Sequence, residues 1–144
     1  LIELLVVVAI IGILAAVGVV AYSGYTSGAK KQAAKSNASA VAKYIAAELQ
    51  KCNLGETSAM SGNLTCSGRN ATKVDAAART ALSDFKNPYD TSKKAVRSSS
   101  SATADADVGF TSTSASGDKV MIKTCWVTPC NQAANRTETS VTVE

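Results

Sequence analysis

The chain has 144 residues, a formal net charge of +4, four cysteines and no histidine. Its length leaves room for one small globular domain, and the missing histidine removes the commonest general base and the usual catalytic triads. The sequence contains no phosphate-binding glycine loop, nucleophile elbow or recognisable catalytic carboxylate pair. We therefore expect a protein that is not an enzyme and that uses no cofactor.

The first predicted element is an apolar helix that begins beside one acidic residue, Glu3. No charge occurs from Leu4 to Ala21, and the next charged residue is Lys30. About 20 apolar residues in a helix are enough to cross the hydrocarbon core of a membrane, which is roughly 30 Å thick. A carboxylate buried there costs on the order of 2.5–3.5 kcal/mol and usually marks function. A cleaved secretory signal fits poorly because the start is acidic and the core is long, and a plain signal anchor leaves Glu3 unexplained.

The segment LIELLVVVAIIGILAAV, residues 1–17, combines Glu3, Gly12 and a Leu-Ala-Ala step in one apolar run. It resembles the N-terminal helix of type IV pilins and of the related type II secretion pseudopilins. Members of that superfamily usually begin, after processing, with a methylated Phe and a Thr before Leu-Ile-Glu, and usually have Pro where this chain has Val20. Whether residues precede Leu1 is therefore left open. Any local melting of the helix would depend on weaker helix breakers such as Gly12 and Gly18.

The resemblance implies a structural subunit of a type IV pilus that assembles through its N-terminal helix into a helical homopolymer. It implies cleavage by a prepilin peptidase, N-methylation, a pool in the inner membrane, and export by pilus assembly machinery into an extracellular filament on the bacterial surface. Glu3 would set the axial register by pairing with the N-terminal ammonium of an adjacent subunit. The heads would serve adhesion, twitching motility or DNA uptake. A type II secretion pseudopilin and a monomeric membrane-anchored binding module are the alternatives.

The helix is predicted to continue beyond the apolar segment. Between Lys30 and Cys52, apolar residues recur at spacings of three and four and form one face. They are Ala34, Ala38, Val41, Ile45, Leu49 and Cys52. We expect an apolar membrane or filament-core helix at 1–28, an amphipathic continuation packed on the head at 29–53, and a globular head at 54–144. The first part is apolar all round, so it needs lipid or other helices.

The four cysteines predict two disulfides and an oxidising compartment. Cys52 and Cys66 flank a loop rich in Gly, Ser and Asn, while Cys125 and Cys130 flank a short turn. We therefore expect local pairing, Cys52–Cys66 and Cys125–Cys130. No metal site is expected from the cysteines, because the chain lacks a Cys-x-x-Cys motif and any histidine.

The head is predicted to contain a loop, one short helix and several strands. We expect a loop at 54–70, a helix at 74–85 with Thr72 as its N-cap, a turn at 87–90 and an exposed loop at 98–104. Strands are expected at 108–113, 119–127 and 139–143, with a hairpin turn at 114–118. The predicted fold class is α+β, a long helix packed on a small antiparallel sheet of three or four strands.

The basic residues are interpreted as spread along the chain. They could attract DNA or anionic surfaces through counterion release, or they could simply keep the surface soluble. Asp105 and Asp107, close to Asp118 if the hairpin forms, are either calcium ligands or solvated loop carboxylates. Trp126 is expected to pack in the core or on the sheet rather than to form a binding platform.

Overall fold

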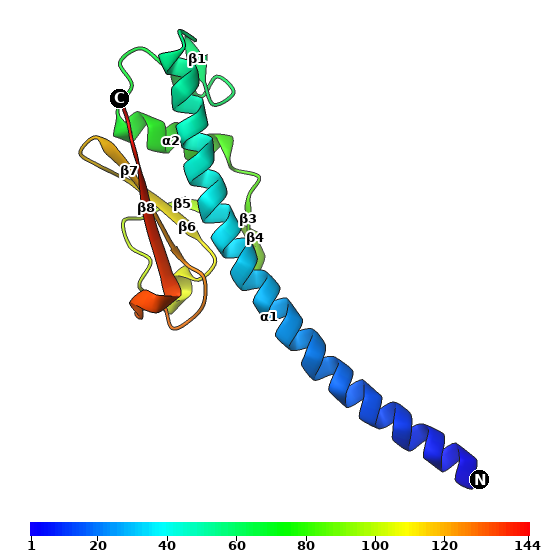
Figure 1. Ribbon diagram of the computed structural model, residues 1–144. Helices are drawn as coiled ribbons and strands as arrows, with labels where there is room; N and C mark the ends of the chain where they lie inside the picture. The colour runs from blue at the N-terminus through cyan, green and yellow to red at the C-terminus, as the bar shows by residue number, and fades with distance from the viewer.

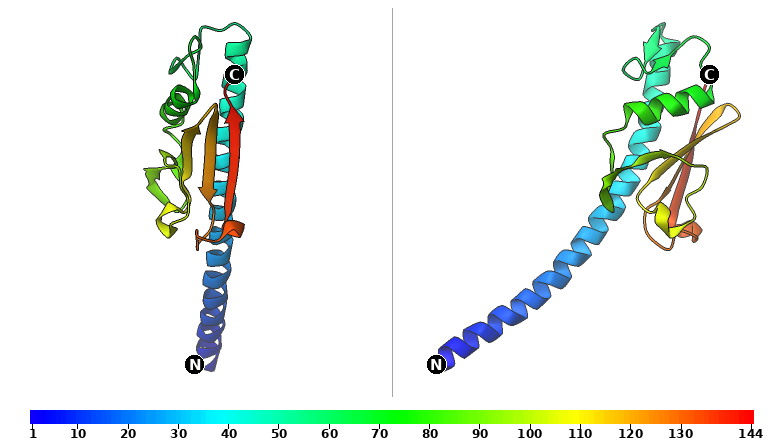
Figure 2. Two further views of the ribbon diagram at one scale, coloured as in Figure 1. Left: turned by 90° about the vertical axis from the view of Figure 1, so that its left-hand side faces the viewer. Right: turned by 180° about the vertical axis from the view of Figure 1, so that it is seen from behind.

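The computed structural model describes every residue from Leu1 to Glu144. A long helix, α1 (Ile2–Asn53), projects from a head that contains all the later elements (Figure 1). The N-terminal half of α1 extends away from the head, and its C-terminal half lies along the head, as two further views also show (Figure 2). The fold is α+β with a long N-terminal helix, as the sequence predicted.

α1 is continuous over 52 residues. Its sequence contains no proline, the residue that would remove a ladder hydrogen bond and clash with the preceding turn. The helix begins after Leu1 without a side-chain cap. It ends at Asn53, and Gly55 follows with a φ of +101°, a left-handed conformation that glycine adopts without the steric penalty of a side chain.

The head consists of short strands, a second helix and two 3₁₀ turns. In chain order, its elements are β1 (Ser58–Ala59), β2 (Leu64–Thr65), α2 (Ala71–Ala81), β3 (Lys86–Asn87), β4 (Asp90–Lys94), β5 (Val96–Ser98), η1 (Asp105–Asp107), β6 (Thr111–Ser116), β7 (Lys119–Cys125), η2 (Ala133–Asn135) and β8 (Arg136–Thr142). β1 with β2 and β3 with β4 form two small hairpins, and the main sheet has the order β5-β6-β7-β8.

The main sheet is mixed, which corrects the expectation of a purely antiparallel sheet. β6, β7 and β8 are antiparallel neighbours, but β5 pairs with β6 in parallel, with Val96 opposite Thr111. Parallel neighbours need a connection long enough to return the chain to the same end of the sheet, and residues 99–110 provide it. The hairpin between β6 and β7 is tighter than expected, since Ser116 pairs with Lys119 across a two-residue loop.

Three local expectations differ from the structure. The loop expected at 54–70 contains the β1–β2 hairpin. The second helix begins earlier than expected, because Asn70 rather than Thr72 is its N-cap and accepts a hydrogen bond from the backbone N–H of Lys73 at 2.9 Å. It also ends earlier, at Ala81. The expected turn at 87–90 does form, and the side chain of Asn87 accepts a hydrogen bond from the backbone N–H of Tyr89 at 2.8 Å.

The core lies between the two helices and one face of the main sheet. All six residues of the apolar face expected on α1 are buried, from Ala34 to Cys52. Four of them, Val41, Ile45, Leu49 and Cys52, belong to one hydrophobic cluster that also contains residues of α2 and β7, among them Val74, Val120 and Ile122. Because side chains alternate along a strand, Val120 and Ile122 point into this core while Met121 and Lys123 are only half-buried.

Candidate assembly interface on the N-terminal helix

The N-terminal half of α1 is an apolar surface that nothing in the chain covers. Residues 1–25 are all exposed, and the head begins to bury the helix only at Ala34. The large apolar side chains that are at least half exposed in this region are Leu1, Ile2, Leu4, Leu5, Val6, Val7, Val8, Ile10, Ile11, Ile13, Leu14, Val17, Val19, Val20, Tyr22 and Tyr25. By length and composition, this is a helix that can cross a membrane. Apolar patches of this size mark sites of contact with lipid or with other protein chains.

Glu3 lies in the first turn of α1, on this apolar surface. Its carboxylate is exposed and takes part in none of the side-chain hydrogen bonds or salt bridges of the chain. The N-terminal end of a helix favours a negative charge, because its first N–H groups have no intrahelical partner. That local effect does not supply the positive partner that a carboxylate needs once lipid or other helices surround it.

Gly12 and Gly18 are also within the exposed half of α1, and the helix continues through both. Apart from the glycine itself, its two chain neighbours and the backbone of the helix, no atom lies within 4 Å of the position that a Cβ would occupy at either glycine. A methyl group would therefore fit at both positions in the isolated chain. A role for the two glycines in local melting stays a prediction.

The point where α1 leaves the head is held by lysine–aromatic contacts. The Nζ of Lys35 lies 3.9 Å from the centroid of the Trp126 ring, and that of Lys30 lies 5.8 Å from the Tyr89 ring. The hydroxyl of Tyr89 donates a hydrogen bond to the backbone carbonyl of Trp126 at 2.7 Å. A cation over an aromatic face is attracted by the ring quadrupole. The two segments of the head that carry these rings are thus joined to each other and to the helix.

Glu48 holds the loop after α1 against the helix. Its carboxylate is buried and accepts a hydrogen bond from the backbone N–H of Met60 at 2.8 Å and one from the ammonium of Lys51 at 2.9 Å. The bond from Met60, reinforced by Lys51, lowers the pKa of Glu48 below its ordinary value despite burial. Met60 and Ser61 have φ values of 55° and 57°, in the left-handed region that non-glycine residues seldom adopt. The carboxylate therefore anchors a sharp turn whose Met60 side chain fills the core.

The structure forms both disulfides on the pairs expected from the sequence. Cys52 bonds to Cys66 with a Cα–Cα distance of 5.3 Å, and Cys125 bonds to Cys130 with a distance of 5.5 Å. The first ties the end of α1 to the segment between β2 and α2. The second closes the loop after β7.

Two of the three acidic residues considered for calcium, Asp105 and Asp107, are engaged in other contacts, and Asp118 is exposed. Asp105 accepts a hydrogen bond from the backbone N–H of Cys130 at 2.8 Å. Asp107 bonds to the guanidinium of Arg97 and accepts one hydrogen bond from the backbone N–H of Ala104 at 2.9 Å. No group of three or more acidic, Cys or His side chains is placed to hold a metal ion. The carboxylates of Asp105 and Asp107 fasten loops of the head.

The predicted functional residues fall in two separate regions. Glu3, Gly12 and Gly18 are on the free half of α1, and the disulfides belong to the head. Sequence reasoning missed Glu48, although its spacing from Ile45 and Cys52 places it on the buried face of the helix. Comparison with protein-family models, with curated proteins and with solved structures found no match.

Proposed function

We propose that the protein is a structural subunit of a type IV pilus. The subunit would be held in the inner membrane by the exposed half of α1 and then assembled through that half into a helical surface filament. The observation that carries this proposal is the contrast along one helix. Its C-terminal half is buried against the head, whereas residues 1–25 are wholly exposed and almost entirely apolar.

The position of Glu3 favours assembly over simple anchoring. When identical helices pack together in a filament core, each carboxylate needs a positive charge from a neighbour. The family resemblance assigns that charge to the N-terminal ammonium of the adjacent subunit. A subunit displaced along the axis would leave both charges buried and unpaired, which costs roughly 3–5 kcal/mol. The pairing would thus select one axial register.

The head supports an outward position in such a filament. Both pairs of cysteines form disulfides, which persist in oxidising compartments such as the periplasm or the cell exterior. With the apolar helices in the centre, the polar head would form the outer surface and carry contacts for adhesion, motility or DNA uptake.

The proposal is tested by shearing cells that produce the chain and analysing the released material by electron microscopy and intact-mass spectrometry. We expect long filaments made of this chain, with a methylated N-terminus and four oxidised cysteines. Retention of the chain in the inner membrane without surface filaments would support a pseudopilin instead. An unprocessed N-terminus on a monomer would support the membrane-anchored binding module, which the length and apolar composition of α1 also permit.

A further inference from the structure

Basic residues occur along the whole chain, but the net excess of positive charge lies in one segment of the head. Residues 69–97, which include α2, β3, β4 and β5, contain seven Lys or Arg and three Asp. This excess of four positive charges equals the net charge of the whole chain, so the remaining residues are neutral in sum. The seven cations are Arg69, Lys73, Arg79, Lys86, Lys93, Lys94 and Arg97.

Most of these cations have no acidic partner. Salt bridges join Arg79 to Asp75 at 3.3 Å and Lys93 to Asp90 at 3.5 Å, and Arg97 pairs with Asp107 of η1. The other four cations are Arg69, Lys73, Lys86 and Lys94, and none of them forms a salt bridge. Even with Asp107 counted, seven cations face four carboxylates, so an excess of three positive charges remains.

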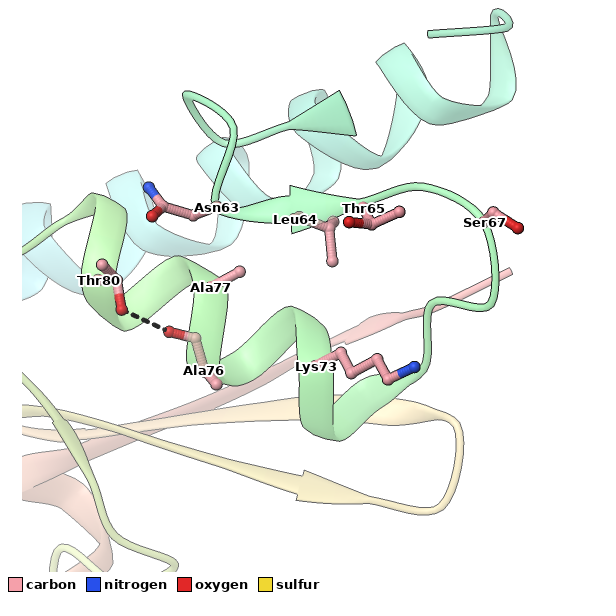
Figure 3. A pocket seen from close by; sticks show the side chains of 8 residues that line it. All are labelled: Asn63, Leu64, Thr65, Ser67, Lys73, Ala76, Ala77 and Thr80. Carbon is pink, nitrogen blue, oxygen red and sulfur yellow. Dashed lines mark hydrogen bonds between the residues drawn. The ribbon is translucent and has the colours of Figure 1, made fainter. Parts of the chain in front are cut away.

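Two recesses adjoin α2, and they differ in charge. The first, of about 380 Å³, lies between β2 and α2 (Figure 3). Its one cation is Lys73, whose ammonium donates a hydrogen bond to the backbone carbonyl of Gly68 at 3.2 Å. The second, of about 330 Å³, lies between the end of α2 and strands β4 and β5. Three cations and three hydroxyl groups line it: Arg79, Lys94, Arg97, Thr80, Ser83 and Ser98. We call this second recess the basic recess.

Of the three cations that line the basic recess, two arginines are held by ion pairs and one lysine has no ion pair. The guanidinium of Arg79 bonds to Asp75 through two nitrogens, at 3.4 and 3.3 Å. The guanidinium of Arg97 bonds to Asp107 and donates to the hydroxyl of Ser112 at 3.2 Å. Lys94 is exposed and unpaired. An anion in this recess would therefore be attracted by the uncompensated positive charge of Lys94. It could also accept hydrogen bonds from N–H groups of the two oriented arginines.

We propose that the basic recess binds an acidic sugar unit of an anionic polysaccharide. The sugar carboxylate would pair with Lys94, and its hydroxyls would exchange hydrogen bonds with Thr80, Ser83 and Ser98. A volume of about 330 Å³ is at the lower end of small-ligand sites, which span about 300–1,000 Å³. No aromatic side chain lines the recess, so it lacks the stacking surface on which single-stranded nucleic acids depend. A DNA duplex would be too wide to enter it.

The proposal does not rest on filament assembly, because binding can be measured on the full chain in detergent micelles. The probe is immobilised polygalacturonate, and the neutral control is the same polymer with its carboxyl groups methyl-esterified. The test variant is Lys94→Gln. The matched control is Lys119→Gln, which removes one exposed lysine from β7, outside the basic segment. Both variants alter exposed side chains, and circular dichroism verifies that each is folded.

We expect the wild-type protein to bind polygalacturonate, to release it as the salt concentration rises, and not to bind the esterified polymer. Lys94→Gln should weaken binding about tenfold, because a charge-assisted hydrogen bond contributes more than a neutral one. Lys119→Gln should stay within about twofold of wild type. Equal weakening by the two variants, or equal binding of the esterified polymer, would overturn the proposal. So would a DNA duplex that displaces polygalacturonate at a lower concentration and depends equally on Lys94, because the surface would then be a nucleic-acid site.

Discussion

Lys35 on α1 and Trp126 in the head are in cation–π contact at the place where the helix leaves the head, with 3.9 Å between the ammonium nitrogen and the ring centroid. Ala34, the first fully buried residue of α1, is the neighbour of Lys35. The contact thus lies at the end of the helix–head interface that is nearest the N-terminus of α1. Trp126 is the only tryptophan in the chain, so the tryptophan fluorescence of the protein reports on the surroundings of this one ring.

We expect Lys35→Met to change the emission of Trp126 and to lower the free energy of unfolding by about 0.5–2 kcal/mol. The variant keeps most of the aliphatic stem but removes the cation above the ring. Fluorescence and thermal unfolding of the full chain in detergent measure both effects. Lys31→Met is the control, since Lys31 has no aromatic contact of this kind. Identical spectra and melting curves for the two variants would contradict this role of Lys35.

Glu48→Ala should destabilise the head by about 1–3 kcal/mol, because the backbone N–H of Met60 would be left buried without an acceptor. Glu48→Gln keeps an oxygen acceptor and loses mainly the ion pair with Lys51, whose ammonium is exposed, and such solvent-accessible pairs contribute only about 0–1 kcal/mol. Thermal unfolding followed by circular dichroism distinguishes the two. Equal losses would mean that charge, rather than the hydrogen bond to Met60, decides the contribution of Glu48.

The carboxylate of Glu48 also makes the stability of the head depend on pH. Glu48 is in the part of α1 packed on the head, outside residues 1–28, and the hydrogen bond from Met60 lowers its pKa. The unfolded chain therefore binds more protons there than the folded chain, and stability contributed by Glu48 is lost as pH falls below the ordinary value of about 4.3. We expect the melting temperature difference between wild type and Glu48→Gln to shrink below about pH 4. A difference that stays constant from pH 7 to pH 3 would contradict this.

The two disulfides should contribute unequally. The bridges join residues 14 and 5 positions apart. In the chain-entropy model, a longer closed loop restricts the unfolded chain more, which gives about 3 kcal/mol for Cys52–Cys66 and about 2 kcal/mol for Cys125–Cys130. Double substitution of each pair by alanine, followed by thermal unfolding, measures the difference. A larger loss at Cys125–Cys130 would show that strain or packing outweighs loop entropy.

The sequence predicted those parts of the fold that depend on local periodicity. Three- and four-residue spacing from Ala34 to Cys52 identified the buried face of α1, because a helix presents such residues on one side whatever they pack against. Local spacing also suggested both disulfides. The N-cap of α2 was predicted at Thr72 but is Asn70, because Asn and Thr are both residue types that cap helices. Packing selects Asn70, because Ala71 and Val74 are then buried within the helix.

Contacts between distant segments could not be read from the sequence. The parallel pairing of β5 with β6 depends on the path of residues 99–110, and no local pattern specifies it. The partner of Glu48 is a backbone N–H in a left-handed turn, which any residue type could supply. The basic recess combines the end of α2 with β4 and β5. In each case, the sequence shows which residues are present but not which residues lie next to them in the fold.

The central claim, assembly through the exposed half of α1 with Glu3 setting the register, is tested most directly by filament yield. Glu3→Gln and the matched control Glu56→Gln, which alters an exposed carboxylate after the end of α1, would each replace the wild-type chain in the producing cells. Sheared filaments would be counted by electron microscopy, and the membrane pool would be quantified separately. Glu3→Asp serves as the conservative variant.

We expect Glu3→Gln to lower filament yield more than about 100-fold with an unchanged membrane pool, because each misregistered or neutralised contact leaves a buried charge unpaired at a cost of roughly 3–5 kcal/mol. Glu3→Asp should be intermediate, and Glu56→Gln should match wild type. Near-normal filaments from Glu3→Gln would contradict the account.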